Sequence, residues 1–226
     1  MSAMVLKSIL TPQLVLQLRT VLLPELFLAG AESASGEARR AKNNRQLSAQ
    51  THPVGAECAS LVAAALQASS VLRNLAVPAR MTQPMFNLYE AGMSYGSHMD
   101  AAMMDTPAGP MRADLSMTIF LSEPSDYDGG ELVSVSSDGT VRTIKLEAGD
   151  AVLYAAATLH EVRPVTRGSR LAGIVWIQSA VPDQGRRDVL MELDRARHAL
   201  EGGDGVEVRQ RLIVVRENLI RLWAQP

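Results

Sequence analysis

Residues 131–154 read ELVSVSSDGTVRTIKLEAGDAVLY, and their pattern decides the fold class. Asp138-Gly139 separates two β-rich runs, Glu131–Ser136 and Thr140–Leu146, and an Asp-Gly pair between such runs is typical of a tight hairpin. A second glycine turn precedes a third run, Ala151–Tyr154. The stretch therefore predicts consecutive short strands joined by turns.

The same alternation of β-rich runs and turns extends outward over residues 85–180. Further strands are predicted at Met85–Tyr89, Ser116–Leu121, Glu161–Val165 and Arg170–Ser179. Short glycine-containing segments that favour turns, such as Asp128-Gly129-Gly130 and Arg167-Gly168, lie between the runs. About seven strands at this spacing predict a β-sandwich or a jelly roll.

The chain on either side of this β-rich region has helical patterns. Thr11-Pro12 predicts a helix start, because threonine caps helices and proline fits the first helical position. A second helix is expected from about Val54 to Leu75, and residues 29–40 are expected to form a surface loop. After Pro182 two more helices are predicted, separated by a break at residues 202–205.

The sequence thus predicts an α+β protein with a mainly β core. The expected architecture is a double-stranded β-helix, a cupin-like jelly roll, flanked by N-terminal and C-terminal helices. We expect three parts: an N-terminal helical support region at 1–79, the jelly roll at 80–180 and a C-terminal helical extension at 181–226.

Composition excludes several classes of protein. The 226 residues carry 22 Lys+Arg and 24 Asp+Glu, so the net charge of −2 gives no electrostatic case for nucleic-acid binding. Hydrophobic residues make up 47%, which excludes a disordered chain. The single cysteine, Cys58, fits a reducing compartment. Pro24 and Glu25 interrupt the apolar stretch from Val21 to Ala31, so no membrane association is expected. A signal peptide is not expected either, because Pro12, Gln13, Gln17 and Arg19 interrupt the apolar run that it would need, and we predict a cytoplasmic protein.

Two of the four histidines, together with one aspartate, suggest a metal site. His98 and Asp100 are two residues apart, and in extended backbone such residues point to the same face. His160 follows the predicted strand Ala151–Tyr154. Two histidines and one carboxylate form the facial triad that holds Fe(II) in non-haem oxygenases and leaves the other metal positions open. An isolated His-x-Asp pair is also common on ordinary loops.

Arg170 is the second unusual residue. It alternates with Ala172, Ile174 and Trp176, so the four share one face of the predicted strand. A cation that faces the interior of a barrel needs a counter-charge, and the dicarboxylate 2-oxoglutarate would provide one. An arginine at the sheet edge, or one paired with an acidic side chain such as Glu123 or Glu131, is the structural alternative.

Several separated segments resemble a known family. They are Tyr89-x-x-Gly92-x-x-Tyr95-x-x-His98-x-Asp100, Asp126-Tyr127-Asp128-Gly129-Gly130-Glu131-Leu132, Ala148-Gly149-Asp150 and Leu159-His160-x-Val162-x-Pro164-Val165-Thr166-x-Gly168-x-Arg170. These resemble the prolyl 4-hydroxylase branch of the 2-oxoglutarate oxygenases. Further segments make the chain similar to the bacterial PKHD-type hydroxylases in particular: Lys42-Asn43-Asn44, Trp176-Ile177-Gln178-Ser179 and Leu193-Asp194-Arg195-Ala196.

The resemblance implies an Fe(II)- and 2-oxoglutarate-dependent dioxygenase with residues 80–180 as its catalytic domain. His98, Asp100 and His160 would bind Fe(II), Arg170 would bind the far carboxylate of 2-oxoglutarate, and Tyr89 would help to hold this cosubstrate. The enzyme would hydroxylate a C–H bond, by analogy in a prolyl residue of a peptide or protein, and release succinate and CO₂. L-Ascorbate would act as the reductant that restores over-oxidised iron.

The resemblance also implies partners and two further positions in the site. The expected partners are 2-oxoglutarate, O₂ and one primary substrate, and the helical flanks offer an interface for a homo-oligomer. Tyr95 matches a tyrosine near the substrate. Trp176 matches a tryptophan packed behind the metal, a position that core packing alone would also explain.

Two other classes of protein would use the same metal ligands. A metal hydrolase or isomerase could hold Zn²⁺ there, but it would need a positioned acid or base and would have no use for Arg170. A 2-oxoglutarate- or iron-sensing cupin-like binding protein could dispense with a metal ligand, whereas all three ligands and Arg170 are present here.

Overall fold

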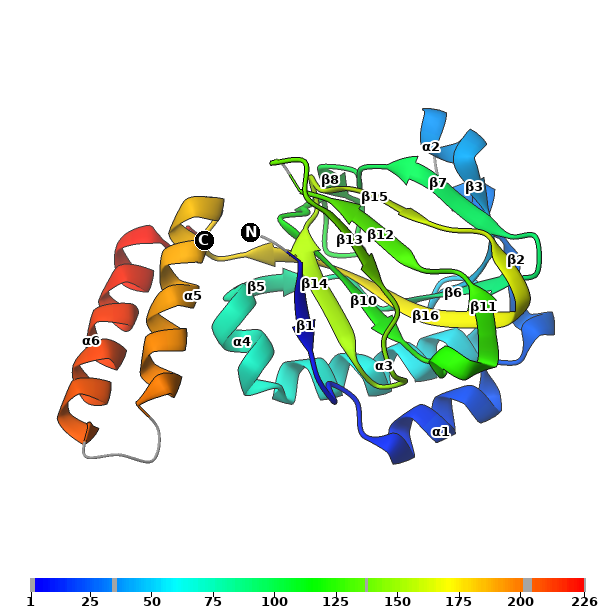
Figure 1. The fold of residues 1–226 in the computed structure, drawn as a ribbon. Helices are drawn as coiled ribbons and strands as arrows, with labels where there is room; N and C mark the ends of the chain where they lie inside the picture. The colour runs from blue at the N-terminus through cyan, green and yellow to red at the C-terminus, as the bar shows by residue number, and fades with distance from the viewer. Residues whose placement is uncertain (1–2, 34–35, 137, 201–204, 226) are drawn as a thin grey trace.

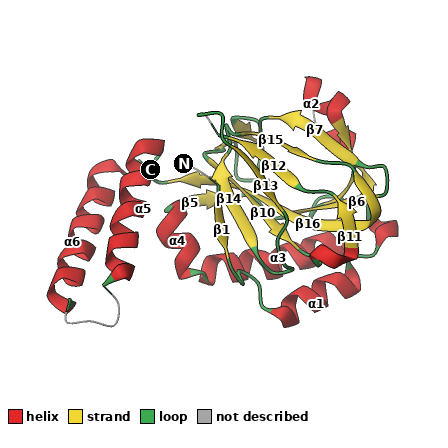
Figure 2. Ribbon diagram, in the orientation of Figure 1, coloured by secondary structure: helices red, strands yellow, loops and turns green. Residues whose placement is uncertain are grey.

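The structure, a computed structural model, describes residues 3–33, 36–136, 138–200 and 205–225. Two antiparallel sheets face each other and form a double-stranded β-helix, with helices outside them (Figures 1 and 2). This architecture confirms the predicted α+β jelly roll. The predicted break at 202–205 lies, apart from Gly205, outside the described residues.

The larger sheet has nine strands among the described residues. Its main path runs in the order β1 (Met4–Leu6), β14 (Ala151–Ala155), β10 (Leu115–Phe120), β16 (Val165–Ser179), β6 (Met85–Glu90), β4 (Arg45–Leu47) and β2 (Leu28–Ala29). Two more strands, β5 (Pro78–Met81) and β11 (Tyr127–Gly129), pair with β16. The long strand β16 therefore lies at the centre of the sheet. The alternating residues predicted to share one face, Arg170, Ala172, Ile174 and Trp176, all lie on this strand.

The smaller sheet has five strands and covers one face of the larger sheet. Its order is β13 (Val141–Ile144), β12 (Leu132–Val135), β15 (Leu159–Val162), β7 (Ser94–His98) and β3 (Lys42–Asn43). The predicted hairpin around Asp138-Gly139 is the antiparallel pair β12–β13. A two-stranded ladder, β8 (Met103–Met104) with β9 (Met111–Arg112), lies outside both sheets.

Helices from the first 80 residues pack against the larger sheet. α1 (Pro12–Val21) begins as predicted, because the Thr11 side chain accepts a hydrogen bond from the amide of Leu14. The predicted second helix is divided into α3 (Pro53–Ala68) and α4 (Ser70–Ala76), and the Ser69 hydroxyl caps α4. Apolar side chains from these helices, for example Leu18, Leu66 and Leu72, join one core cluster with the sheet.

Residues 29–40 differ from the predicted loop. They include a 3₁₀ turn at Gly30–Ser33, and α2 (Gly36–Ala41) begins there. The loop prediction rested on the glycine and serine content, but alanine, glutamate and arginine are good helix formers, so the composition also permits a helix. The short strands β1 to β5 were also not predicted, because two to four residues are too few to show an alternating pattern.

The C-terminal helices α5 (Gln184–Ala199) and α6 (Val206–Trp223) form an antiparallel hairpin beyond the end of β16 (Figure 1). Arg216 of α6 is buried and contacts Asp194 of α5, with 3.1 Å between Nε and Oδ2. The same guanidinium donates to the backbone carbonyl of Asn74 at the end of α4. These contacts fix the hairpin to the helical layer of the domain.

Among the described residues, no helix is by itself both long enough and apolar enough to cross a membrane. Taken together, α3 and α4 meet the length and composition criteria, but they are bent by 76° at their junction.

One tight backbone contact in the jelly roll gives a stability prediction. Gly168 has φ +70°, and a Cβ placed there would lie 2.0 Å from the carbonyl oxygen of Asp126. Gly139 has φ +83° with nothing within 4 Å of its Cβ position. Gly139→Ala should therefore lower the free energy of unfolding by about 1 kcal/mol, because only the positive φ opposes the alanine. Gly168→Ala should lower it by about 2 kcal/mol or more in addition, because the new Cβ also clashes with the Asp126 carbonyl oxygen. Urea unfolding of both variants measures the difference, and equal losses would contradict the contact.

Candidate metal and cosubstrate site

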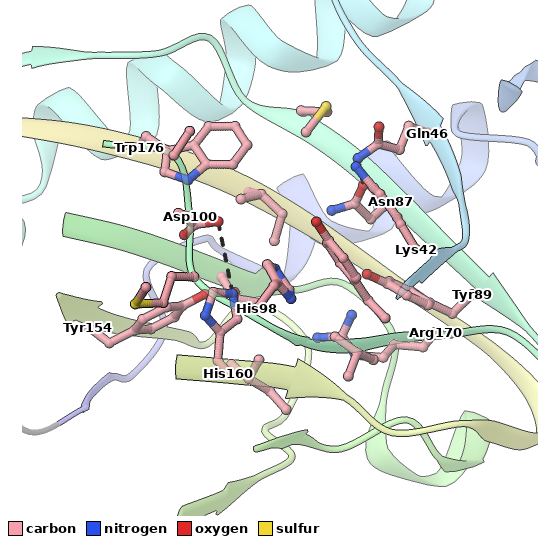
Figure 3. Close-up of a pocket in the computed structure, with 18 of the residues that line it drawn as sticks. Lys42, Gln46, Asn87, Tyr89, His98, Asp100, Tyr154, His160, Arg170 and Trp176 are labelled. Carbon is pink, nitrogen blue, oxygen red and sulfur yellow. Dashed lines mark hydrogen bonds and ion pairs between the residues drawn. The ribbon is translucent and has the colours of Figure 1, made fainter. Parts of the chain in front are cut away.

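A cavity of about 490 Å³ lies between the two sheets (Figure 3). Strand alternation explains its lining, because residues at every second position of a strand share a face. Met85, Asn87 and Tyr89 of β6 line it, as do Arg170 and Trp176 of β16. All five residues predicted for the site (His98, Asp100, His160, Arg170 and Tyr89) border this cavity.

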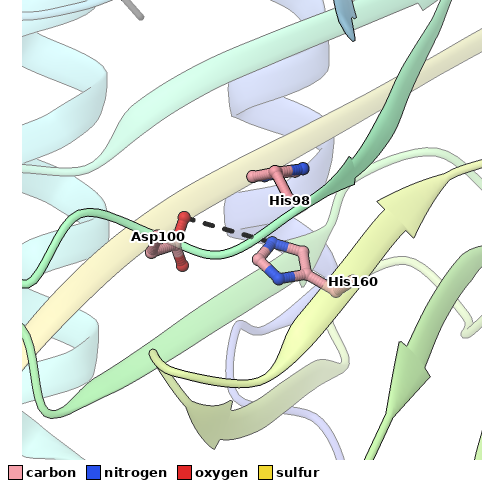
Figure 4. A group of neighbouring side chains, drawn as sticks. All are labelled: His98, Asp100 and His160. Carbon is pink, nitrogen blue, oxygen red and sulfur yellow. Dashed lines mark ion pairs between the residues drawn. The ribbon is translucent and has the colours of Figure 1, made fainter. Parts of the chain in front are cut away.

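The two histidines and the aspartate meet at one point of the cavity (Figure 4). His98 ends β7 and is paired across the sheet with His160 of β15. Asp100 follows two residues after His98. One ligand atom from each side chain lies within 4.8 Å of the others, and Nε2 of His160 is 4.0 Å from Oδ1 of Asp100. This is a facial set of two imidazoles and one carboxylate.

Backbone and hydroxyl groups orient all three side chains. Nδ1 of His98 lies 2.8 Å from the carbonyl oxygen of Gly96, and Nδ1 of His160 lies 2.9 Å from that of Thr158. Each Nδ1 can therefore donate its hydrogen to a carbonyl, which leaves Nε2 free to bind a metal. The Ser116 hydroxyl donates to Oδ2 of Asp100. Ser116 carries no recognisable signal in the sequence, because a single serine in a strand is unremarkable.

His98 has the protonation state that metal binding needs. Burial, and then the neighbouring His160, lower the pKa of His98 to about 4. A histidine with this pKa is neutral at pH 7 and has a lone pair available for a metal. Both histidines are buried, so a metal at this point would be largely shielded from water.

Arg170 lies in the same cavity and is only 1% exposed. Its Cζ is 5.3 Å from the ring centroid of Tyr89, its partner across the sheet, and 5.2 Å from that of Phe120. No hydrogen-bond partner for its Nε or Nη2 is found in the part of the chain that the structure describes. A buried guanidinium with unused N–H groups is costly, so this end of the cavity fits an anion.

Aromatic side chains border the rest of the cavity. The ring of Tyr95 stacks on that of His98, with 3.5 Å between centroids and 14° between planes. The Tyr154 ring meets His160 edge-on at 5.1 Å. Trp176 also lines the cavity, and its indole N–H has no partner among the described residues. Met99 and Met104 lie on the lining, whereas Met111 is buried elsewhere in the structure.

Three polar residues of the cavity carried no functional prediction. Lys42 and Gln46 enter it from β3 and β4, and Asn87 enters from β6. Burial lowers the pKa of Lys42 to about 8, against the opposing effect of Asp100. Lys42 belongs to the Lys42-Asn43-Asn44 segment that resembles the PKHD-type hydroxylases. The direction of its side chain could not be predicted, because β3 has only two residues.

The donor set fits the groups that the sequence resemblance implies. Two imidazoles and one carboxylate suit Fe(II) and leave coordination positions open. The partnerless nitrogen atoms of buried Arg170 suit the far carboxylate of a dicarboxylic acid. Both features border one cavity.

Comparison with known proteins places the chain in a family. The family model described as the 2OG-Fe(II) oxygenase superfamily matches residues 84–178. A PKHD-type hydroxylase of Saccharophagus degradans is 40% identical over 222 residues, covering 96% of this chain and 97% of that protein. Another, from Herminiimonas arsenicoxydans, is 40% identical over 221 residues with the same coverage.

Solved structures show the same fold at lower identity. The crystal structure of a Pseudomonas putida prolyl-4-hydroxylase aligns with a TM-score of 0.54 and 20% identity, covering 78% of this chain and 92% of that one. The similarity to the PKHD-type hydroxylases over nearly the whole chain favours an oxygenase over the hydrolase, isomerase and sensor alternatives. The chain belongs to the PKHD-type hydroxylases, enzymes of the 2OG-Fe(II) oxygenase superfamily.

Proposed function

We propose that this enzyme couples the conversion of 2-oxoglutarate and O₂ to succinate and CO₂ with the hydroxylation of a C–H bond in a primary substrate. His98, Asp100 and His160 are the proposed Fe(II) ligands. The observation that carries the proposal is the presence, in one cavity, of this facial set and of buried Arg170, whose Nε and Nη2 have no hydrogen-bond partner among the described residues.

The protein's part in this reaction is to hold and orient the reactants. Bound Fe(II) would supply the redox chemistry that links oxidative decarboxylation of 2-oxoglutarate to C–H hydroxylation. Arg170 would pair with the far carboxylate of 2-oxoglutarate. Tyr89, whose ring lies against Arg170, would help to hold 2-oxoglutarate in place. The two sheets exclude water from the buried ligands, and Ser116 keeps the Asp100 carboxylate in place.

We propose a prolyl residue in a peptide or protein as the target of hydroxylation. The proposal rests on the resemblance of the sequence motifs to prolyl 4-hydroxylases, and it is an analogy. L-Ascorbate is the proposed reductant that restores over-oxidised iron.

The remaining expectations are also kept as proposals. We propose a cytoplasmic location, in keeping with the single, buried, free Cys58. The division into 1–79, 80–180 and 181–226 is kept, with residues 80–180 as the catalytic domain, and the family model matches 84–178. The C-terminal hairpin is the proposed site of any homo-oligomeric contact.

Succinate release tests the proposed reaction. Purified, Fe(II)-loaded protein is incubated aerobically with 2-oxoglutarate and a library of peptides and metabolites, and succinate is quantified for each. We expect succinate that depends on both Fe(II) and 2-oxoglutarate and increases with at least one library member. The proposal would be contradicted if Fe(II)-bound protein formed no succinate, either with any library member or in the absence of all of them.

Other divalent ions should compete for the same ligands. Affinity for nitrogen and oxygen ligands rises from Fe²⁺ through Co²⁺ to Ni²⁺. We therefore expect Co²⁺ or Ni²⁺ to bind at His98, Asp100 and His160 and to inhibit succinate formation. Crystallography of the Co²⁺-loaded protein measures this directly. A cobalt ion located elsewhere, with the three side chains unoccupied, would refute the ligand assignment.

A further inference from the structure

The C-terminal hairpin bears apolar side chains that recur in steps of four and three residues. On α5 and the residue after it the series is Val189, Leu193, Ala196 and Leu200, and on α6 it is Val208, Leu212, Val215, Leu219 and Leu222. We call these nine residues the hairpin stripe. Such spacing keeps one side of a helix turned toward neighbouring helices, as in coiled coils and four-helix bundles. The hairpin stripe is therefore typical of a surface that packs against other helices.

Much of the hairpin stripe is uncovered in the single chain. Val189, Val208 and Val215 are exposed, and Leu222, at 75%, is the most exposed large apolar side chain among the described residues. Figure 1 shows α6 at the edge of the molecule, with α5 between it and the rest of the domain. Because exposed apolar side chains that cluster on one surface mark interaction sites, this side of the hairpin suits a partner.

The two halves of the hairpin stripe lie on the same side of the hairpin. Successive residues of a helix are about 100° apart around its axis, and the ion pair of Asp194 with Arg216 marks where α5 and α6 face each other. Viewed from the N-terminus of its own helix, each half of the stripe is rotated in the same sense from these residues. Because the helices are antiparallel, both halves face one side. On α5, Arg187 and Met191 are buried on the opposite side, so the stripe faces away from the domain.

A surface hollow of about 400 Å³ lies on the α5 half of the hairpin stripe. It is lined by Val189 and Leu193 of the stripe together with Asp188 and Glu192. We call it the α5 hollow. The two stripe residues give it an apolar lining, so it suits an apolar side chain of a partner.

Contacts within the hairpin show which residues of the two helices lie at the same height. The guanidinium of Arg186 lies over the ring of Trp223, with 5.6 Å from Cζ to the ring centroid, and Asp194 contacts Arg216. Leu222 precedes Trp223 in the chain and is therefore level with the start of the α5 hollow. At 75% exposure, Leu222 does not fill the hollow of its own chain.

A second copy of the chain supplies the complementary surface. A two-fold axis parallel to the helices keeps every residue at its height and places α6 of one copy over α5 of the other. Leu222 of each copy then lies over the α5 hollow of the other, and the small Ala196 lies opposite Val215. Every helix has antiparallel neighbours, as in an up-down four-helix bundle. The hairpin stripe is thus complementary to itself, level by level.

The size of this surface and the charges at its border also fit a second copy. Helices of 16 and 18 residues are about 24–27 Å long, and two of them side by side are about 20 Å wide. Packing two such faces together removes roughly 1,000 Å² or more of accessible surface, the size that a specific interface needs. Glu192 and Arg211 border the stripe on α5 and α6, so both signs of charge flank it. A membrane surface or a nucleic acid would require a mainly basic border.

We propose that the protein forms a homodimer in which two C-terminal hairpins pack face to face as a four-helix bundle, with Leu222 of each copy in the α5 hollow of the other. The proposal develops the homo-oligomeric contact named above. It does not depend on the proposed reaction, because none of the described residues of the hairpin borders the metal and cosubstrate cavity.

Sedimentation equilibrium of the protein tests the dimer. We expect a mass twice the 24.4 kDa of one chain. Leu222→Glu and Val215→Glu each place a carboxylate from both copies in the bundle, so each should raise the dissociation constant by more than about 100-fold. A wild type that is still monomeric at about 100 μM would overturn the proposal, since specific interfaces hold their partners at micromolar concentrations or below. The stripe would then be a site for another protein, a lipid surface or nothing.

Val214→Glu is the matched control for these variants. Val214 is exposed on the same helix but lies outside the hairpin stripe, about 120° around the axis from its centre. We expect Val214→Glu to dimerise like the wild type, and circular dichroism should show an unchanged fold in all three variants, because each replaces an exposed residue. Equal effects of Val214→Glu and Leu222→Glu would overturn the stripe as the interface. So would a dimer that persists in both Leu222→Glu and Val215→Glu.

Disulfide formation between two single variants tests the register. Val189→Cys and Leu222→Cys proteins are mixed, left to exchange subunits and oxidised mildly, while the native Cys58 is buried. Because a disulfide requires Cα atoms within about 7 Å, the mixture should give covalent dimers, and either variant alone should give about tenfold fewer. Equal yields from the mixture and from either variant alone would overturn the proposed register.

These experiments require neither metal nor 2-oxoglutarate, so their failure is distinct from failure of the proposed function. A monomer that forms succinate would overturn the dimer alone. A dimer that binds neither Fe(II) nor 2-oxoglutarate would overturn the proposed function alone.

Discussion

Replacing His160 by alanine is expected to abolish both Fe(II) retention and succinate formation. The variant loses one of three protein ligands, whereas loss of a residue that only supports a ligand already weakens metal binding about 10–100-fold. We therefore expect the metal affinity to fall by more than about 100-fold. Equilibrium dialysis against Fe(II) under anaerobic conditions measures the affinity, and circular dichroism confirms the fold.

His198 provides the matched control for this experiment. It is a histidine on α5, where its Nδ1 contacts the carbonyl of Asp194, and it does not border the cavity. His198→Ala should bind Fe(II) with the wild-type stoichiometry. If His160→Ala retains near-wild-type metal content and activity, the proposed ligand set is wrong.

Replacing Arg170 by glutamine should raise the concentration of 2-oxoglutarate needed to saturate the enzyme, while Fe(II) still binds. Loss of one partner of a buried charge pair costs about 2–5 kcal/mol. At about 1.4 kcal/mol for each tenfold change, the affinity for 2-oxoglutarate should fall roughly thirtyfold or more. Arg170→Lys should have an intermediate effect, because lysine keeps the charge but loses the two-pronged geometry. Titration of metal-loaded protein with 2-oxoglutarate measures all three affinities.

Arg167 on the same strand is the control for Arg170. Its side chain is exposed and pairs with Asp128 at 2.7 Å, outside the cavity. Arg167→Gln should leave the affinity for 2-oxoglutarate unchanged. Equal affinity in the wild type, Arg170→Lys and Arg170→Gln would make Arg170 a structural residue.

The sequence indicated only some of the residues that line the cavity. His98 and Asp100 could be placed on one face because extended backbone alternates with a period of two, and the same rule placed Arg170 with Trp176. The approach of His160 to this pair depends on the register between β15 and β7. No pattern within either strand specifies that register. The expectation that His160 lies near His98 and Asp100 therefore depended on the family resemblance.

Some of the residues that the sequence missed lie where local patterns are too short, and others depend on contacts between strands far apart in the chain. Lys42 and Gln46 point into the cavity because β3 and β4 join different sheets, which is a property of long-range pairing. Ser116 contacts Asp100 only because β10 runs through the larger sheet beside the cavity. Strands of two or three residues show neither period, so such contacts can be read only from the folded chain.

The most direct test of the account is the visible absorption spectrum of the protein with Fe(II) and 2-oxoglutarate in the absence of O₂. We predict a weak charge-transfer band that requires both Fe(II) and 2-oxoglutarate as well as the wild-type site, and that is absent from His160→Ala at the same concentrations. The band should also need more 2-oxoglutarate in Arg170→Gln. Protein that binds Fe(II) but gives no such band at saturating 2-oxoglutarate would contradict the claim that metal and cosubstrate share this cavity.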